Sequence, residues 1–346
     1  MKVGVVSDRN KNIDLIKILS MIFVMGLHSR IDIFCQYPQY NKAFYFFHTI
    51  CGLAVPLFFM VSGYLLLGRD NATWRYSKRK ILSIVRFVSI ITISYWALKS
   101  IVLHSIDLNN LLVISFGSFF QCGDFSQFWY FGAMIIVYLL YPLLNRIYPV
   151  SPHHIKKNAH AYKYFIICIY ILCSLIFVKN LLSENDELFE RLIPQNLRIW
   201  NWIMYFSLGG LAKQIRISKG GTCFMALFCM VVYVMIKNIS LQFIGRVSPE
   251  YYFASPVTGM YVYFVFNMLL NIHIKYPKLI NYLSQLFLPV YTLHMLIIGH
   301  THLVAEYCMS LGMIAPFVYW IFISIMTIIL SHFVMKIPFI DKVFRI

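Results

Sequence analysis

Residues 313–335 read MIAPFVYWIFISIMTIILSHFVM and contain no Asp, Glu, Lys or Arg. A helix needs about 20 mostly apolar residues to cross the hydrocarbon core of a bilayer, so this stretch predicts a membrane-spanning helix. The composition extends the prediction to the whole chain. Of its 346 residues, 60% are hydrophobic and only 12% are charged, about half the charged share of an ordinary soluble domain. The sequence therefore excludes a soluble globular enzyme, a disordered chain and a fibrous protein.

Other apolar runs have the same character, and they are continuous rather than alternating, which favours helices over a β-barrel. We predict an all-α polytopic integral membrane protein with about ten transmembrane helices, forming a single domain over residues 1–346. Residues 111–120 are too short to cross and are expected to be interfacial or re-entrant. The predicted spans are residues 13–34, 43–67, 81–103, 128–147, 164–179, 199–212, 222–237, 255–272, 283–303 and 313–335.

The charges between these spans predict the orientation of the chain. There are 30 Lys and Arg against 13 Asp and Glu, a net charge of +17. With the N-terminus inside, most basic residues fall on the cytoplasmic side and most carboxylates fall outside, so we expect both termini to be cytoplasmic. The same pattern explains the basic balance without nucleic acid, and the lipid bilayer is the expected partner.

The first predicted helix carries ionisable residues, which are costly inside a membrane and are therefore functional candidates. Residues 12–30 read NIDLIKILSMIFVMGLHSR. At about 100° per residue, Asp14, Lys17 and His28 project from one face, and Lys17 and His28 lie roughly 16 Å apart along the axis. They predict two ends of a polar path, with Asp14 and Lys17 compensating each other as an i,i+3 pair. The alternatives are an interfacial histidine and a lysine that snorkels to the headgroups.

Several motifs, in this order, resemble the membrane acyltransferase-3 family. Its first helix has an aspartate-containing turn, then Arg, ten residues and His; here Asp14 is followed by Lys17, ten residues and His28, with lysine in place of arginine. Its second helix ends Ser-Gly-Phe/Tyr, as residues 55–64 (VPLFFMVSGY) do. The other parallels are residues 78–80 (KRK) with Ser83 at the family's last basic position, residues 128–131 (FWYF), residues 141–144 (YPLL), residues 291–294 (YTLH) and Pro338.

The resemblance implies an enzyme of the bacterial inner membrane that O-acylates surface sugars. Acetyl-CoA would be the cytoplasmic acyl donor, and the acceptor would be a glycan or lipid-linked glycan of O-antigen, enterobacterial common antigen or a capsule. Arg79 and Lys80 would then bind the donor, because a basic entrance attracts its phosphates. The positive-inside rule accounts for the same cluster without a ligand.

Acyl transfer to a hydroxyl needs a base that removes the hydroxyl proton, and histidine suits that role near neutral pH. His28 is our candidate for the general base, with a transient acyl carrier as the alternative role. His294 is a second candidate, against a buried structural histidine. Tyr64 and Trp129 are candidates for a sugar or pantetheine site, against an interfacial aromatic belt. Ser62 and Gly63 are expected to serve helix packing.

Two other classes of protein stay open at this point. A polysaccharide exporter or transporter of the same broad family is the main alternative, although paired half-helices in two repeated halves are not evident. A structural or sensory subunit is the second alternative, and the polar face of the first helix argues against it. No metal is expected, because His300 and His302 point apart on a helix and have no third ligand.

Overall fold

The computed structural model describes residues 10–29, 42–149, 155–183, 189–215, 217–244, 248–338 and 340–344. These residues form helices and no strands, which confirms the predicted all-helical class. The helices are α1 (Lys11–His28), α3 (Lys42–Cys51), α4 (Ala54–Leu66), α5 (Trp74–Leu103), α6 (Leu108–Ser115), η1 (Gly117–Phe120), η2 (Ser126–Phe128), α7 (Trp129–Ile147), α8 (Ile155–Leu182), α9 (Phe189–Leu192), η4 (Gln195–Leu197), α10 (Ile199–Gln214), α11 (Lys219–Ile244), η5 (Pro249–Tyr252), α12 (Pro256–Leu270), α13 (Pro277–Gln285), α14 (Phe287–His300), α15 (His302–Met309), η6 (Gly312–Ile314), α16 (Ala315–Val334) and α17 (Ile340–Val343).

The predicted spans fall mainly on helices, but span 43–67 is broken between α3 and α4, and span 283–303 includes the breaks between α13, α14 and α15. Residues 30–34 of the first span lie outside the described residues. Six helical segments of the described chain are long and apolar enough to cross a membrane, or seven if the α13–α14 pair, bent by 57°, forms one span. α10 and α12 are shorter than a full crossing, with 16 and 15 residues. The chain is therefore a multi-pass membrane protein, while the count of ten and the side of the termini stay predictions.

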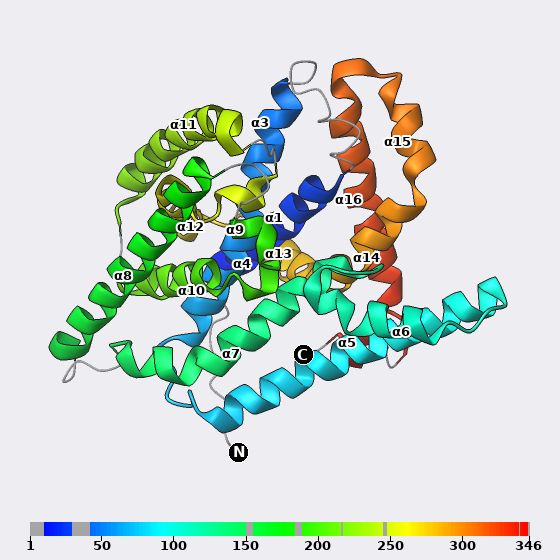
Figure 1. The fold of residues 1–346 in the computed structure, drawn as a ribbon, viewed down its shortest axis with the longest axis horizontal. Helices are drawn as coiled ribbons and strands as arrows, with labels where there is room; N and C mark the ends of the chain where they lie inside the picture. The colour runs from blue at the N-terminus through cyan, green and yellow to red at the C-terminus, as the bar shows by residue number, and fades with distance from the viewer. Residues whose placement is uncertain are drawn as a thin grey trace.

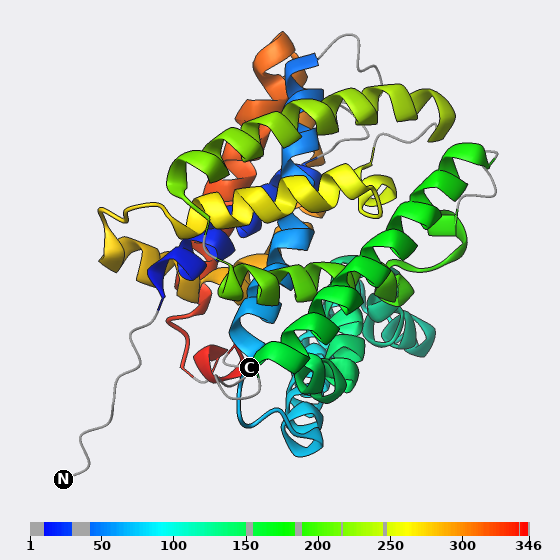
Figure 2. The ribbon, with the colours of Figure 1, turned by 90° about the vertical axis from the view of Figure 1, so that its left-hand side faces the viewer.

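α1 lies inside the bundle rather than at its edge (Figures 1 and 2). It contacts α3, α4, α12, α13, α14 and α16. The Asn10 side chain begins the helix by accepting hydrogen bonds from the backbone N–H groups of Asn12 (3.1 Å) and Ile13 (3.4 Å), a common N-cap arrangement. The Asn12 amide donates to Leu269 O (3.0 Å) and ties the start of α1 to the end of α12. Neighbouring helices thus shield the polar residues of α1 from lipid.

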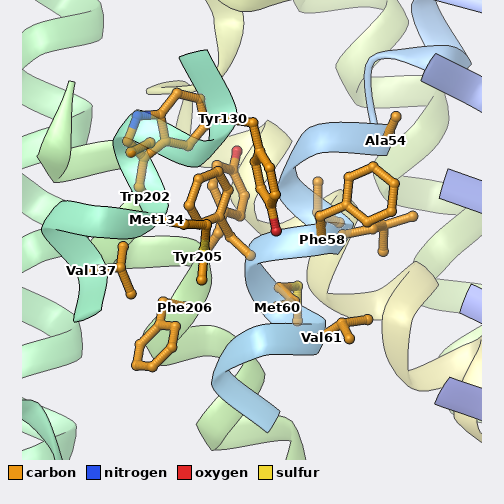
Figure 3. Close-up of a cluster of buried hydrophobic side chains, with 14 of the residues drawn as sticks. Ala54, Phe58, Met60, Val61, Tyr130, Met134, Val137, Trp202, Tyr205 and Phe206 are labelled. Atoms are coloured by element: carbon orange, nitrogen blue, oxygen red, sulfur yellow. The ribbon is translucent and has the colours of Figure 1, made fainter. Parts of the chain in front are cut away.

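The closest helix contact joins α4 and α10, at the centre of the apolar cluster in Figure 3. A Cβ atom on Gly63 would lie 1.7 Å from Phe206 O, and one on Gly209 would lie 2.0 Å from Met60 O. Only glycine permits backbones to approach this closely. The packing role predicted for Gly63 is confirmed, and the ring of Phe59 stacks on Trp202 at 4.7 Å beside this contact.

The outer helices differ from the central ones in burial. Only 22% of the apolar 18-residue window of α5 is buried, against 72% of the corresponding window in Tyr45–Leu66, which contains α4. Exposed apolar side chains along α5, α8 and α11 would be unfavourable in water but match a lipid environment. The predicted short segment 111–120 forms α6 and η1, and α6 packs on α5.

Candidate active site

One cavity opens beside the C-terminal end of α1, and we call it the histidine cavity. Its volume is about 200 Å³, and it is assembled from α1, α3, α4, η2, α7, η4, η5 and α14 with adjoining loops. It is lined by Val24, Leu27, His28, His48, Val55, Gln121, Gln127, Trp129, Gln195, Ser248, Pro249, Glu250, Phe253 and Tyr291. The candidates His28 and Trp129 therefore share one cavity, although about 100 residues separate them in the chain.

The His28 ring of α1 packs beside the ring of a second histidine, His294 of α14. The ring centroids of His28 and His294 are 5.5 Å apart. Nδ1 of His294 lies 2.8 Å from Tyr291 O and 3.3 Å from Val290 O. Because carbonyl oxygens only accept, Nδ1 of His294 carries the proton, and its Nε2 has a lone pair with no hydrogen-bond partner among the described residues. The structure thus pairs two candidates that the sequence treats separately.

A glutamine fastens α14 to the start of α7. Gln127 Nε2 donates to Thr292 O at 3.1 Å, and the Tyr291 hydroxyl donates to Gln127 O. Both bonds use residues of the YTLH motif, so this motif has a structural role besides carrying His294. The result is a fixed wall between η2 and α14 on one side of the histidine cavity.

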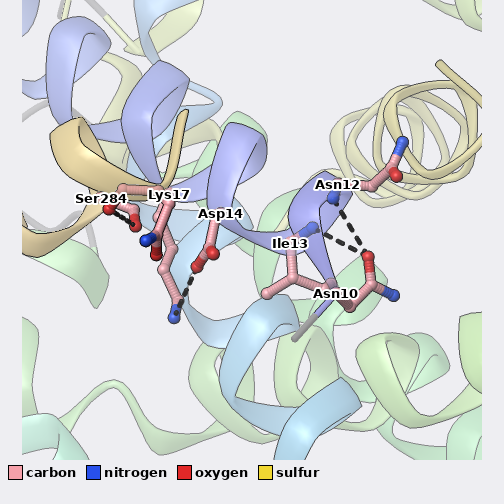
Figure 4. A network of polar contacts seen from close by, with 7 residues as sticks. Asn10, Asn12, Ile13, Asp14, Lys17 and Ser284 are labelled. Carbon is pink, nitrogen blue, oxygen red and sulfur yellow. Dashed lines mark hydrogen bonds and ion pairs between the residues drawn. The ribbon is translucent and has the colours of Figure 1, made fainter. Parts of the chain in front are cut away.

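A second cavity of about 410 Å³, which we call the lysine cavity, lies toward the N-terminal half of α1. Lys17 and Lys80 enter it from α1 and α5, and the rest of its lining is Ser62, Leu65, Ser83, Ile84, Tyr130, Phe131, Met134, Tyr138, Ser284, Gln285, Phe287, Leu288 and Phe344. Lys17 Nζ lies 3.7 Å from the Asp14 carboxylate, and Figure 4 shows the two side chains together. The predicted i,i+3 pairing is confirmed; Asp14 is buried, while the Lys17 side chain remains partly exposed.

Aromatic side chains form the boundary between the two cavities. Tyr130 lines the lysine cavity and Tyr291 lines the histidine cavity. Their rings meet edge to face, with centroids 5.9 Å apart. The neighbouring residue Trp129 faces the histidine cavity, so the first turn of α7 contributes to both sides.

The lysine cavity continues into a basic groove of about 700 Å³ along the start of α5. The groove is lined by Arg75, Lys78, Arg79, Lys80, Leu82, Ser83 and Arg86, of which Lys80 and Ser83 also line the lysine cavity. The Arg79 guanidinium lies over the Tyr76 ring, 5.6 Å from its centroid. Arg86, three residues after Ser83, supplies a charge near the position where the family's last basic residue is missing.

Five candidates line these three hollows: His28, Trp129, Lys17, Arg79 and Lys80. Asp14, His294 and Tyr64 do not, although Asp14 pairs with Lys17 and His294 packs beside His28. Tyr64 lines neither cavity and packs on Phe266 with ring centroids 5.9 Å apart. Its place follows from the helix: two residues after Ser62, which lines the lysine cavity, the side chain points to a different side of α4. The sequence interpretation missed His48, Gln127, Gln195, Glu250 and Arg86; only Arg86 had a signal, at helical spacing from Arg79.

Among the described residues, no three His, Cys, Asp or Glu side chains lie close enough to hold a metal ion. Glu250 is the carboxylate of the histidine cavity and lies in η5, outside the long apolar helices. Burial raises the pKa of its carboxyl, and the nearby Arg198 guanidinium opposes that rise. The histidine cavity therefore offers imidazole, carboxamide and carboxylate groups, whereas the groove offers guanidinium and ammonium groups.

The helical membrane bundle therefore holds a histidine pair beside one cavity and a basic groove beside the other. In the comparison with known families, a family model described as an acyltransferase domain matches residues 10–336. The chain therefore belongs to the acyltransferase-3 family.

Among curated proteins, an amino-acid racemase of Enterococcus faecalis is 29% identical over 146 residues. The aligned part is 40% of this chain and 20% of the racemase, so the likeness is confined to a fifth of that protein. No solved structure matches the chain.

Proposed function

We propose that this chain is a membrane O-acyltransferase that moves acetyl from cytoplasmic acetyl-CoA to a sugar hydroxyl of a cell-surface polysaccharide, such as O-antigen, enterobacterial common antigen or a capsule. Its place would be the bacterial inner membrane, with both termini cytoplasmic. The observation that carries the proposal is an aromatic contact between the two cavities: Tyr130 lines the lysine cavity, Tyr291 lines the histidine cavity, and their ring centroids are 5.9 Å apart.

The donor would bind on the basic side. Acetyl-CoA carries phosphates, and guanidinium groups recognise phosphate by charge-assisted hydrogen bonds. Arg79, Lys80 and Arg86 line the groove that would hold these phosphates. The pantetheine arm would extend through the lysine cavity past Lys80 and Lys17. The thioester would then lie at the contact between Tyr130 and Tyr291.

The acceptor hydroxyl would bind on the histidine side. The His28 imidazole takes the hydroxyl proton while the sugar oxygen attacks the thioester carbonyl carbon. The C–S bond then breaks, the acetyl group stays on the sugar oxygen, and CoA leaves as a thiolate that takes up the proton. His294 would pack beside this base, because the two ring centroids are 5.5 Å apart and the Nδ1 proton of His294 is held by Tyr291 O.

Mass spectrometry of the surface glycan tests the proposal. Cells that express the wild-type chain, cells that lack it, and cells complemented with His28→Ala at equal membrane levels are compared. We expect the glycan to lose one acyl group per repeat without the chain and not to regain it with His28→Ala. Unacylated glycan that fails to reach the surface would support an exporter instead and would contradict the enzymatic proposal.

A further inference from the structure

The polar lining of the histidine cavity includes two residues, Gln127 and Gln195, whose side-chain oxygens have no hydrogen-bond donor among the described residues. It contains one carboxylate and three carboxamides, from Glu250, Gln121, Gln127 and Gln195. Among the described residues that line it, none is Lys or Arg, in contrast to the groove on α5. A ligand that pairs with such a lining must bring hydrogen-bond donors.

Gln127 presents a fixed acceptor to this cavity. Its side-chain N–H group donates to Thr292 O at 3.1 Å, and this bond sets which end of the amide is oxygen. The residue is only 2% exposed, and its Oε1 has no hydrogen-bond partner in the described part of the chain. A buried acceptor without a hydrogen-bond donor is destabilising, so a ligand group that donates to it would bind more tightly.

Gln195 is a second buried glutamine of the cavity lining and comes from a different helix. It begins η4 and is 4% exposed, and its backbone carbonyl accepts from Trp202 Nε1 at 2.6 Å, which holds the residue in place. Its Oε1 is likewise buried without a hydrogen-bond partner among the described residues. Two buried glutamines from segments about 70 residues apart thus line the same cavity, each with an unpaired side-chain oxygen.

Two cations in the described part of the chain act on residues of the cavity lining, and both also contact other groups. Arg198 Nε donates to Ile193 O at 2.9 Å, and its guanidinium acts on Glu250. Lys237 Nζ lies 3.0 Å from Thr49 Oγ1 and 4.9 Å from the centroid of the Tyr45 ring. Neither cation lines the cavity. An anionic ligand there would face the Glu250 carboxylate and two carboxamide oxygens, an arrangement that disfavours it.

We propose that the histidine cavity selects an uncharged, hydroxyl-bearing sugar residue as acceptor, with Gln127, Gln195 and Glu250 accepting hydrogen bonds from hydroxyls other than the one that is acylated. This inference rests on the function proposed above and names its acceptor class. The cavity of about 200 Å³ has room for roughly seven waters at about 30 Å³ each, which is the scale of one sugar ring. Uronic and sialic acid residues would be excluded by their carboxylates.

The first test locates the acyl group. Glycans from cells with the wild-type chain and from cells with His28→Ala are compared by NMR, and the sugar residue that gains the acyl group is identified. We expect an uncharged sugar. An acyl group on a uronic or sialic acid residue would overturn this inference and leave acyl transfer intact. No difference between the two glycans would remove the proposed function and this inference with it.

The second test assigns the lining residues. Purified full-length variants in lipid nanodiscs receive acetyl-CoA and the unacylated glycan from the His28→Ala cells. Gln127→Met and Gln195→Met should each raise the acceptor KM about tenfold or more while the donor KM stays unchanged. The reason is that each substitution removes an acceptor that would bind a sugar hydroxyl. Gln242→Met is the matched control, since Gln242 is exposed on α11 and lines neither cavity. Unchanged acceptor KM values in both variants would contradict the assignment.

A third variant tests the charge argument separately. Glu250→Gln keeps an acceptor oxygen but removes the carboxylate, so we expect the uncharged acceptor to remain a substrate and a competing hexuronic acid glycoside to inhibit more strongly than in the wild type. Equal inhibition of both proteins by this anionic glycoside would show that Glu250 does not set the charge preference.

Discussion

The histidine cavity and the basic groove are built in opposite ways. The groove belongs to one helix, α5, and its charges stand within residues 75–86. The histidine cavity needs eight helical elements, and its polar residues range from His28 to Tyr291. A charged patch on one exposed helix can be read from residue spacing, whereas a mixed polar cavity inside a bundle exists only after the helices have packed. The comparison leads to four predictions, from the largest expected effect to the smallest.

Separating α4 from α10 should destroy both regions together. α4 carries Val55 at the histidine cavity and Ser62 at the lysine cavity, and it is held by the glycine contact with α10. We expect Gly63→Ala to cost about 3 kcal/mol or more, because its Cβ would lie 1.7 Å from Phe206 O and backbone cannot yield as a side chain does. Folded yield and thermal stability in detergent measure this. Gly299→Ala, where nothing lies within 4 Å, is the control and should be nearly neutral.

Removing the base should affect only the histidine side. We expect His28→Ala to lower kcat by about 10²–10⁴-fold, the usual contribution of general base catalysis, with little change in the donor KM. Steady-state acetyl transfer by the purified protein checks the prediction. His300→Ala, an exposed histidine of α14 outside both cavities, should keep wild-type activity. A His28 variant with full activity would eliminate histidine base catalysis at this position.

Removing charge from the groove should affect only the donor side. We expect the double variant Arg79→Ala, Lys80→Ala to raise the KM for acetyl-CoA about tenfold and to weaken its dependence on salt, because exposed charges are screened by ions. The acceptor KM should not change. Lys278→Ala, an exposed lysine on α13, is the control. If the acceptor KM rose instead, the assignment of the two sides would have to be exchanged.

The smallest effect is expected where the chain departs from its family. Lys17 occupies the family's arginine position, pairs with Asp14 at 3.7 Å and lines the lysine cavity. Arginine keeps the charge and adds a bidentate fork, so Lys17→Arg should stay within about twofold of wild-type activity, whereas Lys17→Met should lose more by weakening the compensation of Asp14. Parallel measurement of kcat and of the donor KM for both variants decides this; equal loss in both would show that the charge of Lys17 is not used.

Sequence reasoning succeeded where a local pattern carries the information. Long apolar runs predicted the helices, and helical spacing predicted the Asp14–Lys17 pair, since both depend on residues within a few turns of each other. The sugar or pantetheine role of Tyr64 stays a prediction, because an aromatic residue next to a motif does not reveal which side of its helix a neighbour covers, and its ring packs on Phe266.

By itself, the sequence determined that this chain is a helical membrane protein, and it pointed to the acyltransferase-3 family and to the polar residues of α1. Only the tertiary structure decided that the rings of His28 and His294 lie with centroids 5.5 Å apart and that Gln127 and Gln195 line one cavity. It also decided that α4 packs closely against α10 at Gly209. The physical reason is the distance along the chain over which each kind of information acts. Hydrophobic periodicity encodes how one helix buries its own face, but the distance between helices far apart in the chain depends on the packing of the whole bundle.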